Sequence, residues 1–258
     1  MRSVHDMKEF KVDKLSVVIA ESNSEMGRIA AKAIAADLIR LGKEKSEIRV
    51  MFAAAPSQNS MFEALGNEAG IPWEKIVAFH MDEYVGISID RPQSFRLFLK
   101  KAVFDRKPFK AVNLIEGDSR DIEATVCDYE RRLLERPMDM IVLGIGENGH
   151  IAFNDPDVAD FNDNHMVKIV ELDDVCRQQQ VNDGCFSAFD DVPKRAVTVT
   201  IPAFRQAGVL HCVVPNSRKA NAVKEALCGP VTERCPASIL RTHENAHLYL
   251  DAESASLL

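Results

Sequence analysis

Apolar residues along the chain alternate between short continuous runs and longer segments with helical spacing. Residues 15–20 form a run that predicts a buried strand, and residues 25–42 place apolar positions every three or four residues, with Gly42 as the expected helix end. The same alternation continues as strand, helix and strand at residues 48–55, 60–70 and 75–81. This pattern predicts βαβ units and a largely parallel sheet.

The second half of the chain continues the alternation. Residues 124–137 predict a helix, and the apolar run 138–146, which ends in glycines, predicts a buried parallel strand. Further strand-like or helical segments lie at residues 196–204, 209–215, 216–229 and 247–253. Because repeats, linkers and low-complexity tracts are absent from the sequence, we expect residues 1–258 to form a single α/β domain with an open, mostly parallel Rossmann-like sheet flanked by helices.

Composition narrows the class of partner. The chain has 258 residues, of which 46% are hydrophobic, and a formal net charge of −7 with a pI near 5.6. Binding to nucleic acid or to an anionic membrane surface needs clustered Lys and Arg, so we expect neither partner. A small molecule is the expected partner, and an anionic one would need a specific loop of local donors.

Cysteine usage and apolar runs indicate the compartment. The six cysteines are scattered without a CxxC pair, which favours neither a zinc site nor a disulfide framework, so reduced thiols are expected and no metal is expected. No apolar run reaches the length of a membrane span, and residues 1–15 lack the apolar region of a signal peptide. These features predict a cytoplasmic protein.

Open α/β sheets bind ligands beyond the carboxyl ends of their strands, so the segments that follow the predicted strands are the candidate sites. The first, FHMDEYVG at residues 79–86, carries Asp82 and Glu83. A solvated turn or a helix N-cap is the structural alternative. Carboxylates also act as general bases when burial changes their pKa. Because adjacent residues of a strand point in opposite directions, only one of Asp82 and Glu83 is expected to face a ligand.

The second segment, GIGENGHIAFNDP at residues 144–156, contains a GxGxxG pattern, and Glu171 lies where a ribose-binding acid would be sought. A dinucleotide site needs the last glycine to open a helix. Pro156 and several Asn and Asp residues instead predict an irregular loop. Its glycines would let the backbone approach a ligand and present Asn148, His150 and Asp155 together, with His150 as the acid–base candidate because histidine is the side chain that ordinarily exchanges protons near neutral pH.

The third segment, residues 54–61, joins a predicted strand to a predicted helix. Its hydroxyls, amides and free N–H groups form a plausible anion cradle at Ser57, Gln58, Asn59 and Ser60. The alternative is ordinary helix capping by Asn59 or Ser60.

Together FHMDEYVG and GIGENGHIAFNDP closely resemble the glucosamine-6-phosphate deaminase (isomerase) family. The resemblance extends over most of the chain, through RPQSF (91–95), VPKRAVTVTIPAF (193–204) and SRKANAV (217–223). Related sugar-phosphate lactonases share the fold but differ at the acidic strand end and after the glycine–histidine pair, where HIAFN favours the deaminases.

The resemblance implies an enzyme that opens a sugar ring, isomerises aldose to ketose and releases ammonia from carbon 2, without a metal or redox cofactor. By this resemblance Asp82 moves the proton between carbons 2 and 1, and His150 assists ring opening. Asn148 occupies a position that is Asp or Asn in the family. Asp155 stands where the family has the Glu that orients the histidine.

The phosphate-binding positions depart from the family pattern. Family members carry a Ser-Gly-Gly-Thr type of loop where this chain has residues 57–60, and the arginine expected within residues 178–186 is absent. Lys219 matches a family lysine, and Arg177 or Arg218 could replace the arginine.

Three functions follow from this pattern. The first is conversion of an amino-sugar phosphate, with glucosamine 6-phosphate as the expected substrate. The second is isomerisation of another sugar, or of one held without a 6-phosphate. The third is a non-catalytic sugar-phosphate sensor. Since family members range from single chains to hexamers, the resemblance is compatible with a homo-oligomer and does not fix the oligomeric state.

Overall fold

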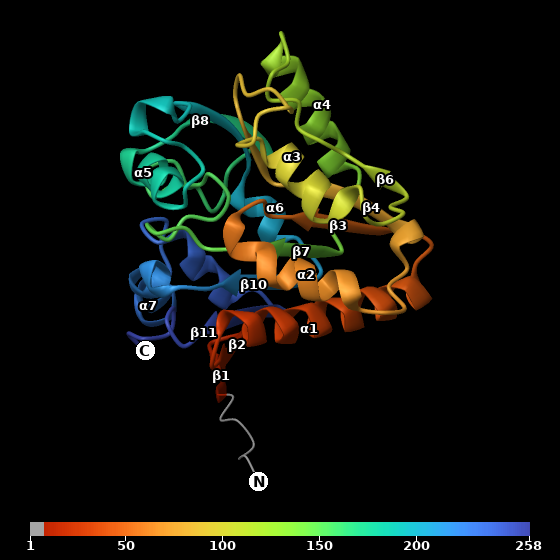
Figure 1. The fold of residues 1–258 in the computed structure, drawn as a ribbon, viewed down its shortest axis with the longest axis vertical. Coiled ribbons are helices and arrows are strands. Elements are labelled where there is room, and N and C mark those ends of the chain that lie inside the picture. Colours follow the sequence, from red (N-terminus) through yellow and green to blue (C-terminus); the bar gives the residue numbers. More distant parts are fainter. Residues whose placement is uncertain (1–7) are drawn as a thin grey trace.

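A central, mostly parallel sheet organises the protein (Figure 1). The computed structural model describes residues 8–258, and within them eight strands pair in the order β1-β2-β11-β10-β7-β3-β4-β6. The edge pair β1–β2 is antiparallel and the other neighbours are parallel. The strands are β1 (Lys8–Val12), β2 (Leu15–Ala20), β3 (Ile48–Phe52), β4 (Ile76–His80), β6 (Ala111–Val112), β7 (Met140–Leu143), β10 (Leu210–Val214) and β11 (Ala246–Asp251).

A second, smaller sheet lies beyond the carboxyl end of β4. It is antiparallel, in the order β5-β9-β8. Its strands are β5 (Asp82–Tyr84), β8 (Val167–Glu171) and β9 (Arg195–Val199). Because β5 begins directly after Met81, the chain passes from the large sheet into the small one at Asp82.

Helices cover both faces of the large sheet. Successive side chains of a strand point to opposite faces, and in β3 Val50 and Phe52 join one apolar cluster while Met51 joins the other. The first cluster includes side chains of α1, α2 and α3, and the second includes side chains of α4, α6 and α7. The helices are α1 (Asn23–Glu44), α2 (Asn59–Asn67), α3 (Phe95–Leu99), α4 (Ile122–Leu134), α5 (Asp174–Asn182), α6 (Ile201–Arg205) and α7 (Ala220–Cys228).

Short helical turns connect several of these elements. They lie at Pro56–Gln58 (η1), Trp73–Lys75 (η2), Lys100–Phe104 (η3), Phe189–Asp191 (η4), Ser217–Lys219 (η5) and Pro236–Thr242 (η6). Two of them, η1 and η5, follow the parallel strands β3 and β10 and so lie at the carboxyl edge of the large sheet. None of the helices within residues 8–258 combines the length and apolar content needed to cross a membrane.

The structure confirms the predicted fold class and differs from the sequence analysis in two details. Residues 196–204, predicted as strand-like or helical, contain both types of element, because β9 ends at Val199 and α6 begins at Ile201. Gly42 does not end α1, which continues to Glu44; a Cβ at Gly42 would lie 2.4 Å from Pro72 Cγ, so close packing accounts for this glycine. Strand β1 was not predicted. The expectation of no signal peptide falls partly on residues 1–7, outside the described residues.

Candidate active site

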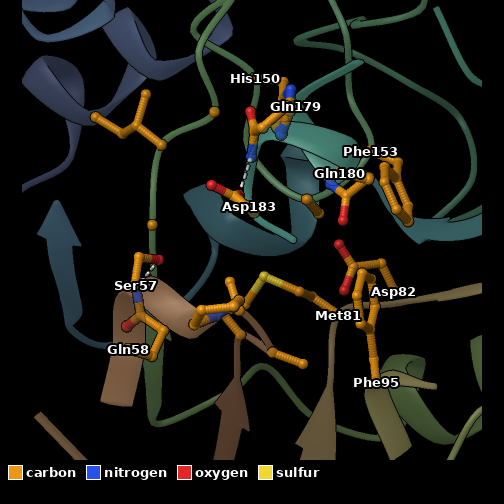
Figure 2. A pocket seen from close by; sticks show the side chains of 18 of the residues that line it. Ser57, Gln58, Met81, Asp82, Phe95, His150, Phe153, Gln179, Gln180 and Asp183 are labelled. Carbon is orange, nitrogen blue, oxygen red and sulfur yellow. Dashed lines mark hydrogen bonds between the residues drawn. The ribbon is translucent and has the colours of Figure 1, made fainter. Parts of the chain in front are cut away.

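A pocket opens where the parallel strands end (Figure 2). Its wall combines the segments that follow β3, β4 and β7, as the sequence predicted, with α5 and the turn η5 after β10. The side chains brought together include Asp82, His150, Ser57, Gln58 and Lys219. Residues that are far apart in the sequence therefore share one cavity at the carboxyl edge of the sheet, where open α/β sheets bind ligands.

Asp82 presents an unpartnered carboxylate to this pocket. Its residue is 7% exposed, and no side chain or backbone group within residues 8–258 donates a hydrogen bond to the carboxylate. Burial raises the pKa of Asp82 well above the usual carboxyl range, and the neighbouring Glu83 raises it further. The group is thus placed and tuned to exchange a proton with a bound ligand.

Glu83 points away from the pocket and is occupied by structural contacts. It is fully buried and accepts hydrogen bonds from Ser94 Oγ at 2.8 Å and from Arg96 Nε at 3.1 Å. It also accepts from the backbone N–H groups of Tyr84, Phe95 and Arg96. Glu83 therefore anchors the segment that leads into α3, as expected for adjacent strand residues that point in opposite directions.

Asn148 and Asp155 both contact the Nδ1 side of the His150 ring. Its Nδ1 lies 2.7 Å from Asn148 Oδ1 and 2.9 Å from Asp155 Oδ1, while Asn148 Nδ2 donates to Asp155 Oδ1 at 2.9 Å and to Asp173 Oδ2 at 3.0 Å. Two acceptors around Nδ1 place the proton there and leave the Nε2 lone pair free as a base. Burial would raise the pKa of Asp155, but His150 and Asn148 lower it below its usual value.

Glycine is required where the His150 ring packs on its own loop. A Cβ at Gly146 would lie 2.1 Å from His150 Cε1, so a larger residue would displace the ring. Gly149 adopts a φ of +85°. No helix follows Gly149, and Ile151 instead pairs with Asn154 in an isolated bridge. The loop therefore lacks the helix N-terminus that a dinucleotide site needs.

Strand β9 joins the two loops that carry Asp82 and His150. Thr198 is the register partner of Asp82 in the β5–β9 pair. The Thr198 hydroxyl also accepts a hydrogen bond of 3.0 Å from the backbone N–H of Phe153, which lies shortly after His150. A single fully buried residue of β9 thus contacts both loops.

The predicted anion-binding residues separate into two groups. Ser57 and Gln58, in η1, line the pocket, as does Lys219 at the end of η5. Asn59 and Ser60 begin α2 outside the pocket: Ser60 Oγ donates to Asn23 Oδ1 at 2.6 Å, and Asn59 borders a separate surface cleft with Phe62 and Lys101.

Lys219 is the one lysine or arginine among the described residues that line the pocket. It is 3% exposed, its ammonium makes no ion pair or hydrogen bond within residues 8–258, and burial lowers its pKa. Neither arginine considered from the sequence lines the pocket. Arg177 donates to the carbonyls of Phe189 and Val192, and Arg218 pairs with Asp183 at 2.5 Å.

Helix α5 and the turn after it contribute residues that the sequence analysis did not select. Gln179 accepts a hydrogen bond from the Glu147 N–H at 2.8 Å and so ties α5 to the histidine loop. Gln180 lines the same pocket as Asp82, and the two side chains point toward one another (Figure 2); Gln180 is 7% exposed, and its carboxamide has no hydrogen-bond partner within residues 8–258. The run of three glutamines where the family resemblance implied an arginine was the available signal.

Comparison with known proteins agrees with this geometry. Residues 21–249 match the model of the family described as glucosamine-6-phosphate isomerases/6-phosphogluconolactonase. The glucosamine-6-phosphate deaminase of Lactobacillus delbrueckii subsp. bulgaricus is 32% identical over 244 residues, covering 95% of this chain and 100% of that protein. The deaminase of Streptococcus gordonii is also 32% identical, covering 95% of this chain and 99% of that protein.

Solved structures give the same assignment. A monomeric glucosamine-6-phosphate deaminase superposes with a TM-score of 0.85 at 28% identity, covering 94% of this chain and 99% of that chain. A 6-phosphogluconolactonase from Thermotoga maritima shares the fold with a TM-score of 0.73 at 21% identity, covering 92% of this chain and 100% of that chain. The resemblance stated from the sequence motifs is thereby confirmed. The chain belongs to the family of glucosamine-6-phosphate isomerases and 6-phosphogluconolactonases.

Proposed function

We propose that the protein converts glucosamine 6-phosphate and water into fructose 6-phosphate and ammonia. The observation that carries this proposal is the pairing, in one pocket, of the unpartnered Asp82 carboxylate with a His150 whose Nδ1 is held by Asn148 and Asp155. Such a pair supplies two separate proton carriers, which an aldose–ketose isomerisation needs. The deaminase relatives support the same choice of substrate.

Ring opening is assigned to His150. In the closed sugar the O1 hydroxyl loses its proton and the ring oxygen gains one, while the bond between carbon 1 and the ring oxygen breaks. The free Nε2 accepts the first proton and returns it to the ring oxygen. Asn148 and Asp155 act as positioning residues, because they fix the tautomer that leaves Nε2 unprotonated.

Isomerisation is assigned to Asp82. Its carboxylate removes the proton from carbon 2 of the open aldehyde while the aldehyde oxygen takes up a proton from the substrate ammonium group, which gives an enediol-type intermediate that still carries the amino group. Return of this proton to carbon 1 places a C=N bond at carbon 2. Water adds to that bond and ammonia leaves, so the reaction consumes one water and needs no oxidant or reductant.

The anionic end of the substrate is assigned to Ser57 and Lys219, and Gln58 positions the turn, because its Nε2 donates to the Val213 carbonyl at 3.0 Å and to Ser57 Oγ at 3.3 Å. The turn η1 precedes α2, and Lys219 contributes a buried ammonium without a protein partner within residues 8–258. The Lys219 ammonium would donate a charge-assisted hydrogen bond to a phosphate oxygen of the substrate. Asn59 and Ser60 are left out of this assignment, because both lie outside the pocket and the Asn59 N–H already donates to the Pro56 carbonyl.

A second candidate is isomerisation of a sugar that carries no 6-phosphate. One cation is a modest counter-charge for a dianion, and the carboxylate of Asp183 lines the same pocket as Lys219. The two neutral amides of Gln179 and Gln180 suit hydroxyl groups better than a phosphate.

The test is an ammonia-release assay over glucosamine 6-phosphate, galactosamine 6-phosphate and unphosphorylated glucosamine, run beside thermal-shift binding to the same compounds. We expect release from glucosamine 6-phosphate. Release from glucosamine alone would favour the second candidate, and binding without release would favour a sensor. Hydrolysis of 6-phosphogluconolactone serves as the lactonase control, because that reaction requires no proton transfer at carbon 2.

A further inference from the structure

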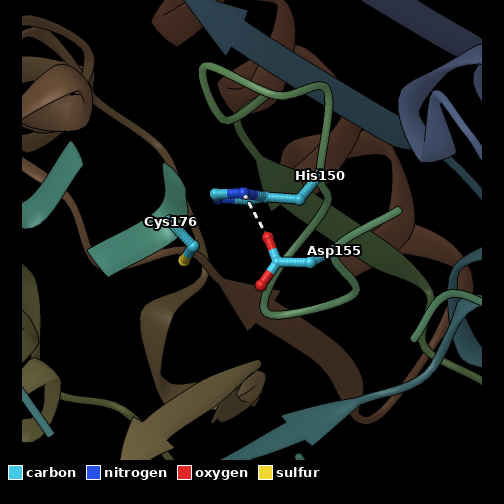
Figure 3. A group of neighbouring side chains, drawn as sticks. All are labelled: His150, Asp155 and Cys176. Carbon is cyan, nitrogen blue, oxygen red and sulfur yellow. Dashed lines mark ion pairs between the residues drawn. The ribbon is translucent and has the colours of Figure 1, made fainter. Parts of the chain in front are cut away.

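Three side chains with metal-binding atoms meet beside the pocket (Figure 3). His150 and Asp155 come from the loop after β7, and Cys176 comes from the first turn of α5. One ligand atom from each residue lies within 4.8 Å of the other two, and all three residues are buried. The sequence predicted no metal site because Cys176 has no nearby cysteine or histidine partner, but the fold supplies the partners from a distant loop.

The cluster has the composition of a transition-metal site. Imidazole, carboxylate and thiolate are the ligands that Zn²⁺ accepts, whereas Mg²⁺ and Ca²⁺ prefer oxygen. Zinc–ligand bonds of about 2.0–2.3 Å in a tetrahedron separate the ligand atoms by about 3.3–3.8 Å, so a contraction of about 1 Å would close the site. Asp155 Oδ2 is buried and has no hydrogen-bond partner within residues 8–258, which leaves one carboxylate oxygen available.

We propose that His150, Asp155 and Cys176 form an inhibitory site for a thiophilic divalent cation, with Zn²⁺ as the first ion to test. Three protein ligands leave a fourth position for water, the arrangement of open zinc sites. On binding, the Cys176 thiol releases its proton to solvent and a sulfur–metal bond replaces it.

Inhibition follows from either mode of histidine ligation, and this part of the inference rests on the proposed role of His150. If Nδ1 binds the cation, its proton is lost from that atom and the remaining N–H of the neutral ring is at Nε2, which then cannot accept a proton. If Nε2 binds the cation, its lone pair is occupied. Both modes remove the base assigned to ring opening, and both take Asp155 away from its positioning contact.

The metal site is tested first with Co²⁺ alone, since a cobalt–thiolate bond gives a near-ultraviolet charge-transfer band that does not depend on any enzymatic activity. We expect the whole protein to bind one equivalent with this band. Cys176→Ser should abolish the band, and His150→Gln should weaken binding by more than about tenfold. Cys185→Ser is the matched control, because Cys185 also lines the pocket but lies outside the cluster, and it should keep the band.

Inhibition is tested by zinc titration of ammonia release, with Mg²⁺ as the control ion. We expect Zn²⁺ to inhibit the wild type and Cys185→Ser alike, and Cys176→Ser to need more than about tenfold more zinc. A cobalt–thiolate band that survives Cys176→Ser, or the absence of one-to-one binding by folded wild type, would overturn the site. Full turnover with the band saturated would overturn the inhibition. If the protein releases no ammonia at all, the proposed function fails while the cobalt band still decides the site.

Discussion

Replacing Asp82 with Asn separates its proposed chemistry from its structural role. The carboxylate accepts no hydrogen bond within residues 8–258, and its burial beside Glu83 disfavours the charged form. The amide has nearly the same shape and no charge, so the free energy of unfolding should stay within about 1 kcal/mol of the wild-type value. A thermal or urea melt checks this expectation, and binding of the sugar phosphate should persist.

Turnover of Asp82→Asn should fall sharply. Loss of a positioned general base typically lowers the rate by about 10²–10⁴-fold, which corresponds to about 2.7–5.4 kcal/mol of transition-state free energy. The measurement is ammonia release together with exchange of solvent deuterium into carbon 1 or carbon 2. Because exchange requires removal of the carbon 2 proton, it should fall with turnover. A loss of turnover with intact exchange would place Asp82 in a later step.

Glu83→Gln is the matched comparison, since Glu83 is the adjacent carboxylate. It accepts from Ser94 and Arg96, so removal of its charge leaves the buried Arg96 guanidinium with Asp118 as its remaining carboxylate partner and should cost about 1–3 kcal/mol of stability. The fraction that stays folded should still exchange deuterium. If folded Glu83→Gln abolishes exchange while Asp82→Asn retains it, the assignment of the base is wrong.

Four further outcomes follow from the site. His150→Gln should slow turnover of the closed-ring substrate by about 10²–10⁴-fold and that of an open-chain analogue much less, and equal losses would assign the histidine to another step. Lys219→Met should raise the Michaelis constant for a phosphorylated substrate by about 10–150-fold, the equivalent of about 1.5–3 kcal/mol, and an unchanged constant would move the phosphate site elsewhere. Asp82 must be ionised to accept a proton, and burial raises its pKa. As the pH is lowered, kcat/KM should therefore begin to fall at a pH well above the usual range of carboxyl pKa values. Gln180→Glu, which adds a carboxylate beside Asp82, should move that fall to still higher pH, and an unmoved profile would contradict the placement of Asp82.

The parts of the structure that the sequence predicted are those that local patterns encode. Buried parallel strands such as β7 are short apolar runs, and α1 has the spacing of an amphipathic helix. The grouping of Asn148, His150 and Asp155 could be predicted because all three residues lie within one short glycine-containing loop after β7. Their contacts therefore form between residues that are close in sequence.

The parts that were missed depend on contacts between distant segments. Gln180 reaches the pocket, and Cys176 reaches His150 and Asp155, only because α5 docks there, and no local pattern predicts that docking. Ser60 appeared equivalent to Ser57 in sequence, but helical geometry turns it toward Asn23 on α1. The small sheet was missed because β5 is a short strand whose partner β9 lies far along the chain.

The double contact of Thr198 makes β9 a spacer between the two loops that carry the proposed proton carriers, Asp82 and His150. Thr198 pairs with Asp82 through the backbone and holds Phe153 through its hydroxyl, so the gap between base and histidine is set by a segment that contains neither. Thr198→Val would keep the β-branched shape and release one loop. Turnover would then fall although both side chains are still present, since a misplacement of about 1 Å in such a pair can cost about 10²-fold. The relative positions of the two proposed proton carriers therefore depend on the register of β9, a strand that carries neither of them. A shift or loosening of β9 would lower turnover even though the large sheet stays folded.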